Sequence, residues 1–337
     1  MTFLVIRFQS LGNVAMSVPI ISSLSARYPQ HRFVGVARHA LSAMFYGLPN
    51  VVFHETSLQG GGFAMLSLFS ELKSYAIDAV IDLQDNSYSY ILRTLYRIKR
   101  LPIYVIDKGA LEKRTLIRKG HKQSAPLISE FERYAQVFRM AGLEADTRFE
   151  HIPVHVEVQE QLIERFGNKE GRWIGIAPFA KNQSNILPNR VIKDVIAYFS
   201  HQANTRLYLF GAGLIEGEML RQWASIFPNV VSVAGQIPLE QELELIRMQD
   251  VMVGMDSANQ HLSALVGTPT ISIWCGTHPF MGFAAWRQDP DYMLQTNFNC
   301  RPCCENGTNI CKYRNFACKN ISAEQIIQLI TKKLNSN

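Results

Sequence analysis

Residues 253–269 read VGMDSANQHLSALVGTP. The apolar start predicts a short buried strand, residues 256–260 form a polar turn, and a short helix then ends at Gly267. A strand, a polar turn and a helix start in this order present unpaired backbone N–H groups to an anion, most often a phosphate. Asp256 and Ser257 are also favourable helix caps, so the same residues are consistent with a purely structural role.

Strand and helix patterns alternate along the rest of the chain. Apolar runs predict strands at residues 3–8, 33–37, 51–54, 78–83, 103–106, 173–177, 207–210, 230–233, 250–255 and 270–274. Helical spacing predicts helices at residues 14–28, 65–75, 90–99, 129–141, 189–202, 216–227, 239–248 and 322–334. This alternation predicts the α/β class with doubly wound parallel sheets. Ligands bind beyond the carboxyl ends of such strands, which points to residues 9–13 and 84–87. Asn13 is expected to cap the first helix.

The length of 337 residues predicts two domains. We place a Rossmann-like N-terminal domain at residues 1–155 and a Rossmann-like C-terminal domain at residues 156–337, with the connection inside 143–170. The last helix is a candidate to pack back on the first domain. A central cleft between two facing domains is the default binding site.

The composition, 47% hydrophobic and 18% charged, fits a chain with sizeable cores. No run of about 18 apolar residues predicts a membrane-spanning helix. The first residues lack the basic start and long apolar middle of a signal peptide, so we expect a cytoplasmic location.

The net charge of +6 comes from the first half of the chain. Residues 1–150 hold 18 Lys and Arg against 12 Asp and Glu, and residues 93–122 hold ten basic residues against two acidic ones. Such a concentration indicates a phosphorylated substrate, an anionic membrane surface or nucleic acid as partner, or a solvated basic face. Only two aromatic residues, Tyr96 and Tyr104, fall in this window, which disfavours a nucleic-acid platform.

Several enzyme classes are disfavoured by missing motifs. The turn at residues 211–213 (GAG) lacks the third glycine and the following acid of a dinucleotide fingerprint. No P-loop and no G-x-S-x-G elbow occur.

The chain resembles glycosyltransferase family 9, the ADP-heptose:lipopolysaccharide heptosyltransferases, over nearly its whole length. The resemblance rests on VIRFQSLG at 5–12 with Ala15, Met16 and Pro19, IGIAPFAK at 174–181, MDSANQHL at 255–262 with Gly267, Thr268 and Pro269, and GTHP at 276–279. It implies a GT-B fold, metal-independent transfer with inversion and an ADP-sugar donor held by the C-terminal domain. It also implies an acidic lipid-linked glycan as acceptor on the N-terminal domain, peripheral contact with the inner face of the inner membrane, a monomer and no nucleic acid.

The resemblance also assigns roles to residues. The start of the second-domain helix would hold the donor's diphosphate, and Lys181 would neutralise the leaving phosphates as a catalytic group. The donor-binding set is Asn185, Glu216 (with Glu218 as alternative), Asp256, Ser257, Ala258, Asn259, His261, Thr277 and His278. The acceptor-binding set is Ser10, Gly12, Arg118 and Lys119.

Two positions depart from the family pattern. Asn13 stands where the family has an aspartate, the expected general base, and Asn185 stands where it has a lysine. General-base assistance is worth roughly 10²–10⁴ in rate. Three explanations stay open: a slow enzyme, a different base such as Asp82 or Asp85, or a degenerate member that binds nucleotide sugar or glycan without turnover.

Five of the six cysteines lie between residues 300 and 318. Cys300, Cys303, Cys311 and Cys318 would suit a structural zinc site, although their spacing is not that of a standard finger and the family's chemistry requires no cofactor. The alternative is a set of reduced thiols that pack a surface loop.

Overall fold

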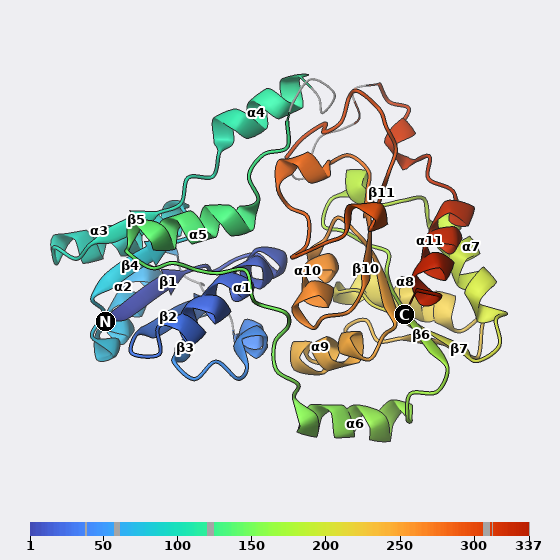
Figure 1. Cartoon of the computed structure of the whole chain (residues 1–337), viewed down its shortest axis with the longest axis horizontal. Helices are drawn as coiled ribbons and strands as arrows, with labels where there is room; N and C mark the ends of the chain where they lie inside the picture. The colour runs from blue at the N-terminus through green and yellow to red at the C-terminus, as the bar shows by residue number, and fades with distance from the viewer. Residues whose placement is uncertain (38, 57–60, 120–124, 306–310, 312, 337) are drawn as a thin grey trace. The chain divides into compact units, whose positions relative to one another are not determined.

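The computed structural model describes residues 1–37, 39–56, 61–119, 125–305, 311 and 313–336. Two compact units divide the chain. The first contains residues 1–108 and 130–153, and the second contains residues 109–129 and 154–337 (Figure 1). Residues 109–129 thus group with the second unit, although the sequence pattern places them with the N-terminal domain.

The first unit is a five-stranded parallel sheet in the order β3-β2-β1-β4-β5. Helices α2 and α3 pack together over Leu4, Val34 and Val80 on one face, and α1 and α5 pack together on the other. The bounds are β1 Thr2–Ile6, α1 Leu11–Arg27, β2 Arg32–Ala37, β3 Val51–Glu55, α2 Gly61–Glu71, β4 Ala79–Asp82, α3 Ser87–Ile98, β5 Ile103–Val105 and α5 Glu130–Met140.

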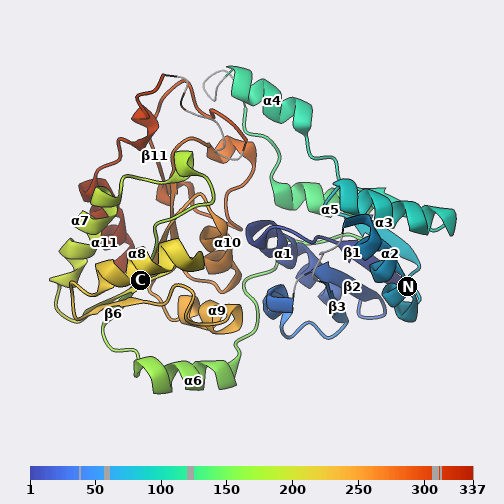
Figure 2. The same cartoon turned by 180° about the vertical axis from the view of Figure 1, so that it is seen from behind.

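The second unit is a six-stranded parallel sheet in the order β11-β10-β9-β6-β7-β8. Helices α7, α8 and α11 cover one face and α6, α9 and α10 pack together elsewhere on the unit (Figure 2). The bounds are α4 Ala110–Lys119, α6 Val156–Phe166, β6 Arg172–Ala177, α7 Asn189–Ser200, β7 Thr205–Leu209, α8 Gly213–Ala224, β8 Val230–Ser232, α9 Leu239–Arg247, β9 Val251–Met255, α10 Ala258–Leu265, β10 Thr270–Trp274, β11 Met293–Gln295 and α11 Ala323–Leu334.

The predicted α/β class and the predicted strands and helices are confirmed, and α4, α6 and β11 are additional. Helix α1 begins at Leu11 with Ser10 as its N-cap, so the prediction that Asn13 caps it was wrong and Asn13 lies in the first turn. The last helix, a candidate to pack back on the first domain, belongs to the second unit. Helix α11 buries Ile326 and Ile330 in the core of the second unit, because these residues form its apolar face.

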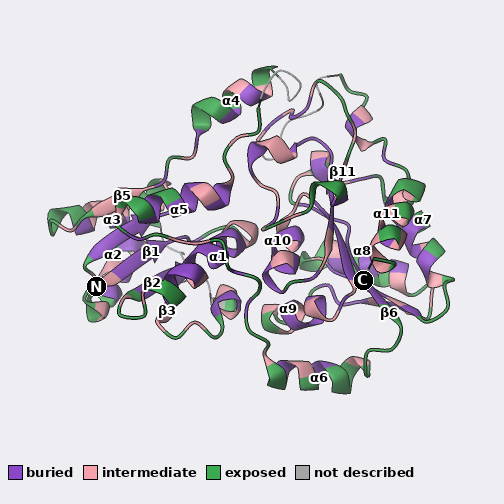
Figure 3. Cartoon of the chain, in the orientation of Figure 1, coloured by how far each residue is buried: buried purple, intermediate pink, exposed green. Residues whose placement is uncertain are grey.

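In both units the buried residues are concentrated in the sheets. Their strands are largely buried, whereas α3, α4 and α6 each expose one side (Figure 3). Within the described part of the chain, no helix combines the length and the apolar character that a membrane span requires. In parallel sheets of this kind, the loops at the carboxyl ends of the strands are the place where a site can be built.

Gly175 in β6 pairs with Met252 of β9 and leaves no room for a side chain. A Cβ added there would lie 1.9 Å from Met252 Sδ and 3.1 Å from the Phe210 ring. We expect Gly175→Ala to lower the free energy of unfolding by about 1–3 kcal/mol in urea denaturation, because the buried methionine must repack. The matched control is Gly254→Ala in β9, whose added Cβ would have its nearest neighbour at 3.9 Å. Equal losses in the two variants would contradict the argument.

Candidate functional site

Asp256 directly follows strand β9, and its carboxylate accepts hydrogen bonds from three segments of the chain. Thr277 Oγ1 donates to Oδ2 at 2.5 Å from the turn after β10, and Asn185 Nδ2 donates to the same oxygen at 3.2 Å from the loop after β6. Gln260 Nε2 donates to Oδ1 at 3.1 Å from helix α10. These contacts tie the loops after three neighbouring strands to one carboxylate.

All three of these partners are neutral. Burial therefore raises the pKa of Asp256 to about 6, and the hydrogen bonds from Thr277 and Gln260 and the charge of Arg301 lower it only in part. A carboxyl group with this pKa takes up and releases a proton just below neutral pH.

The start of α10 contains buried polar atoms that lack partners. Ser257 is the N-cap, yet its side chain makes no capping hydrogen bond. Among the described residues, no group bonds Ser257 Oγ, Asn259 Oδ1, Gln260 Oε1 or His261 Nδ1. Buried polar atoms normally have partners, so this concentration indicates that a ligand belongs here. The helix start adds N–H groups and a positive dipole end that suit an anion, and Ala258 occupies its first position.

His261 is neutral in this setting. Its side chain is buried, and burial lowers its pKa to about 4. It can thus offer a hydrogen bond but no charge to a ligand near neutral pH. His278 also has a local role: its Nδ1 accepts from Phe280 N at 3.1 Å and caps a short helical turn.

Arg301 is a site residue that the sequence did not reveal. Its guanidinium is fully buried and donates to the carbonyl oxygens of Trp274, Cys275 and Thr277 in the turn that presents Thr277 to Asp256. The only signal available in the sequence was a basic residue inside the cysteine-rich segment.

The other predicted donor residues differ in their surroundings. Asn185 is buried and belongs to the Asp256 cluster, whereas Lys181 is exposed on the same loop. Glu216 Oε2 accepts from Ala212 N at 3.0 Å, so it closes the turn before α8. Glu218 is exposed and pairs with Arg221 at 2.7 Å.

The first unit places Ser10, Gly12 and Asn13 together at the start of α1. Asn13 Nδ2 donates to Ser10 Oγ at 3.2 Å, and the Asn13 backbone carbonyl accepts from Tyr134 at 3.4 Å. The neighbouring loop approaches this turn, since Gln9 N donates to Gln84 Oε1 at 3.3 Å. An asparagine in this arrangement supplies hydrogen bonds but takes no proton.

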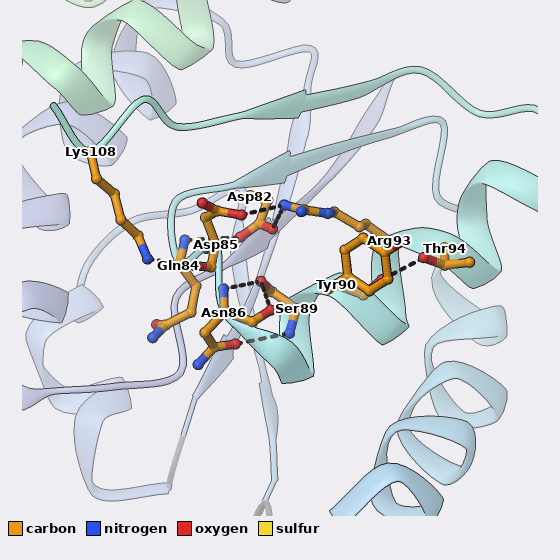
Figure 4. A network of polar contacts seen from close by, with 9 residues as sticks. All are labelled: Asp82, Gln84, Asp85, Asn86, Ser89, Tyr90, Arg93, Thr94 and Lys108. Atoms are coloured by element: carbon orange, nitrogen blue, oxygen red, sulfur yellow. Dashed lines mark hydrogen bonds and ion pairs between the residues drawn. The ribbon is translucent and has the colours of Figure 1, made fainter. Parts of the chain in front are cut away.

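The two carboxylates of the neighbouring loop are both bound to Arg93 (Figure 4). Arg93 Nη1 lies 2.8 Å from Asp82 Oδ2 and 2.8 Å from Asp85 Oδ1. Asp82 is fully buried, and its Oδ1 accepts from the backbone N–H groups of residues 84 and 85. Asp85 keeps a side chain that is 38% exposed and has a left-handed backbone, with φ of 43°. Of the two, only Asp85 can meet a substrate.

Arg118 and Lys119 are exposed on the last turn of α4, in the second unit. Helix α4 packs through Lys113, whose Nζ lies 3.0 Å from Glu305 Oε1 and 4.6 Å from the centre of the Phe283 ring. The predicted acceptor-binding residues therefore fall into two sets, one in each unit.

All six cysteines are free. Among the residues that the structure describes, no group of three or more His, Cys, Asp and Glu side chains is placed to hold a metal ion. Residues 306–310 and 312 of the cysteine-rich segment lie outside that description. The zinc alternative stays a prediction.

Solved structures of several glycosyltransferases have a similar fold. ADP-heptose lipopolysaccharide heptosyltransferase II of E. coli superimposes with a TM-score of 0.72 at 16% identity, over 100% of this chain and 99% of that one. A family 9 glycosyl transferase from Veillonella parvula gives a TM-score of 0.78 at 16% identity, over 100% and 98%. E. coli WaaC, solved with ADP, gives 0.68 at 17% identity, over 99% and 100%. The predicted GT-B fold, with two Rossmann-like units, is confirmed.

Sequence comparison agrees with the fold. The lipopolysaccharide core heptosyltransferase OpsX of Haemophilus influenzae is 21% identical over 290 residues, which are 82% of this chain and 79% of OpsX. The model of glycosyltransferase family 9 (heptosyltransferase) matches residues 65–314, well over half of the chain. The chain therefore belongs to glycosyltransferase family 9.

Proposed function

We propose that this protein transfers a heptose-like sugar, with inversion, from an ADP-activated donor to an acidic lipopolysaccharide-core or other lipid-linked glycan. The observation that carries the donor half is the start of α10, where buried polar atoms without partners surround an N-terminal helix end. WaaC, a structural neighbour, was solved with ADP and also with an ADP-fluoroheptose. OpsX, the sequence relative, acts as a lipopolysaccharide core heptosyltransferase.

The donor's diphosphate would lie against the N–H groups at residues 257–261, where the helix dipole offsets its charge. Negative charge grows on the diphosphate as the sugar leaves, so fixed N–H donors assist departure. Lys181, exposed on the loop after β6, would neutralise the same phosphates. No step in this scheme requires a metal ion.

The acceptor hydroxyl needs a proton acceptor, and Asn13 cannot serve as one. Asp85 is the carboxylate that best fits the role, because it is partly exposed while Asp82 is buried and fully bonded. Its contact with Arg93 Nη1, at 2.8 Å, holds the carboxylate in a fixed orientation. The basic residues Arg118 and Lys119 would bind the acid groups of the acceptor.

A second candidate function is sugar or nucleotide binding without turnover. Two observations favour it: Asp82 and Asp85 are both paired with Arg93, and the Asn13 side chain, an amide, donates to Ser10. This alternative shares the donor site and differs in the proton chemistry alone, so one assay separates the two.

Ser257 gives a direct test of the donor site. We expect Ser257→Ala to leave thermal stability unchanged, because its hydroxyl makes no capping bond. ADP affinity measured by calorimetry should fall by roughly 10- to 100-fold, since hydrogen bonds to charged groups are worth about 1.5–3 kcal/mol. The matched control is Ser322→Ala, which removes the real cap of α11. It should cost about 1 kcal/mol of stability and leave ADP binding intact. Native protein that binds no ADP at millimolar concentration would exclude the donor site.

The base can be tested by restoring it. Asn13→Asp should raise the rate of ADP release from ADP-heptose, with a lipid-A-type acceptor, by about 10²–10⁴ if the missing base limits turnover. Asn204→Asp, an exposed turn residue, is the control for an added charge and should change nothing. If the native chain is active and Asp85→Asn abolishes release, Asp85 is the base. A native chain that releases no ADP, together with rescue by Asn13→Asp, would overturn the enzymatic proposal in favour of binding alone.

A further inference from the structure

Arg301 makes a full set of hydrogen bonds without any contact with water. Nε donates to Cys275 O at 2.5 Å, and Nη2 donates to Trp274 O at 3.0 Å and Thr277 O at 2.7 Å. Nη1 donates to Gln295 Oε1 at 3.0 Å and to Thr296 O at 2.5 Å. All five N–H bonds of the guanidinium are therefore used, which offsets the cost of burying its charge.

Four consecutive carbonyl groups face this segment. Arg301 binds those of residues 274, 275 and 277, and the N–H of Cys303 donates to Gly276 O at 2.8 Å. The N–H of a trans peptide points opposite to its carbonyl, so the N–H groups of residues 275–278 are directed away from Arg301. The Gly276 N–H shows this direction, since it reaches Ser184 O at 3.2 Å in the loop after β6.

We propose that Arg301 is a positioning residue for the nucleotide-sugar diphosphate, acting from behind the turn at residues 275–278. It fixes that turn so that the Thr277 hydroxyl donates to Asp256 and the peptide N–H groups face the donor side. The inference rests on the proposed donor site. It adds a residue that does not itself contact substrate.

The planar fork of arginine is needed for this role, not only its charge. Lysine carries the same charge on a single nitrogen with three N–H groups, so it cannot donate to all five acceptors of Arg301 at once. The charge has a separate effect. Among the groups around Asp256, the hydrogen-bond donors Asn185, Gln260 and Thr277 are neutral, Cys275 is a buried thiol, and Arg301 is the cation that lowers the Asp256 pKa.

The test uses the full chain with Arg301→Lys and Arg301→Met, and ADP as the probe in calorimetry. We expect both folded variants to bind ADP at least about tenfold more weakly than the native chain, because the turn loses its fixed orientation. In the double variant Arg301→Lys with Thr277→Val, affinity should be no weaker than in the worse single variant, since both act through one turn. In Arg301→Met the Asp256 pKa should rise above its native value of about 6, because the positive charge is removed. The pH profile of ADP binding should then shift toward higher pH.

Arg206→Met is the matched control. Arg206 is a half-buried arginine near the start of β7, three strands away from β10 in the sheet, and it donates to Phe166 O at 2.5 Å. It should lose stability but keep the native ADP affinity and pH profile. If neither Arg301 variant folds, Gln295→Ala removes one of the five acceptors from an exposed position and should weaken ADP binding by about two- to threefold.

The outcomes separate the two proposals. Three results would each overturn the positioning role alone. The first is an ADP affinity of folded Arg301→Lys within twofold of native, and the second is a double variant in which the two losses of affinity multiply. The third, if neither Arg301 variant folds, is an unchanged ADP affinity in Gln295→Ala. A native chain and an Arg206→Met variant that both fail to bind millimolar ADP would overturn the donor site and the positioning role together.

Discussion

The carboxylate of Asp256 is the constraint on which the binding edge of the second unit depends. Asp256 directly follows β9, which lies between β6 and β10 in the sheet. A buried carboxylate needs hydrogen-bond donors to replace water. Here the donors come from the loop after β6, the turn after β10 and helix α10. Because each donor belongs to a different segment, satisfying this one group sets the position of all three segments. The proposed anion site at the start of α10 follows from that arrangement.

The carboxylates at the end of β4 in the first unit have different partners from Asp256. Asp82 is the last residue of β4 and Asp85 lies in the loop after it. Both contact one guanidinium, that of Arg93, whereas Asp256 accepts from neutral hydrogen-bond donors. The first arrangement is a partly buried ion-pair network around one arginine. In the second, burial raises the pKa of the Asp256 carboxyl to about 6. The proposed function assigns proton removal to the first arrangement and diphosphate binding to the second.

The sequence predicted the fold well because strand and helix periodicity is a local property. It failed where the signal was not periodic. Helix α6 was hidden in a segment interpreted as a connection, and β11 is only three residues long. The turn at residues 256–260 was also predictable, from residue types that cap helices and face anions. Arg301 was not, because its role depends on five acceptors, three of them backbone carbonyls of a turn more than twenty residues away. The sequence shows a basic residue but not the carbonyl groups that face it.

Asn185 shows how the two departures from the family pattern differ physically. At that position the family resemblance predicts a lysine that binds phosphate. The asparagine here is buried and replaces that charge with one hydrogen bond at 3.2 Å. The cation that acts on Asp256 is then Arg301, from behind the turn. Asp256 thus receives neutral hydrogen-bond donors and the charge of a buried guanidinium. At Asn13, Ser10 and Tyr134 supply hydrogen bonds but no base. In the proposed function, the donor side therefore keeps the groups around Asp256, while the proton acceptor must be a residue other than Asn13.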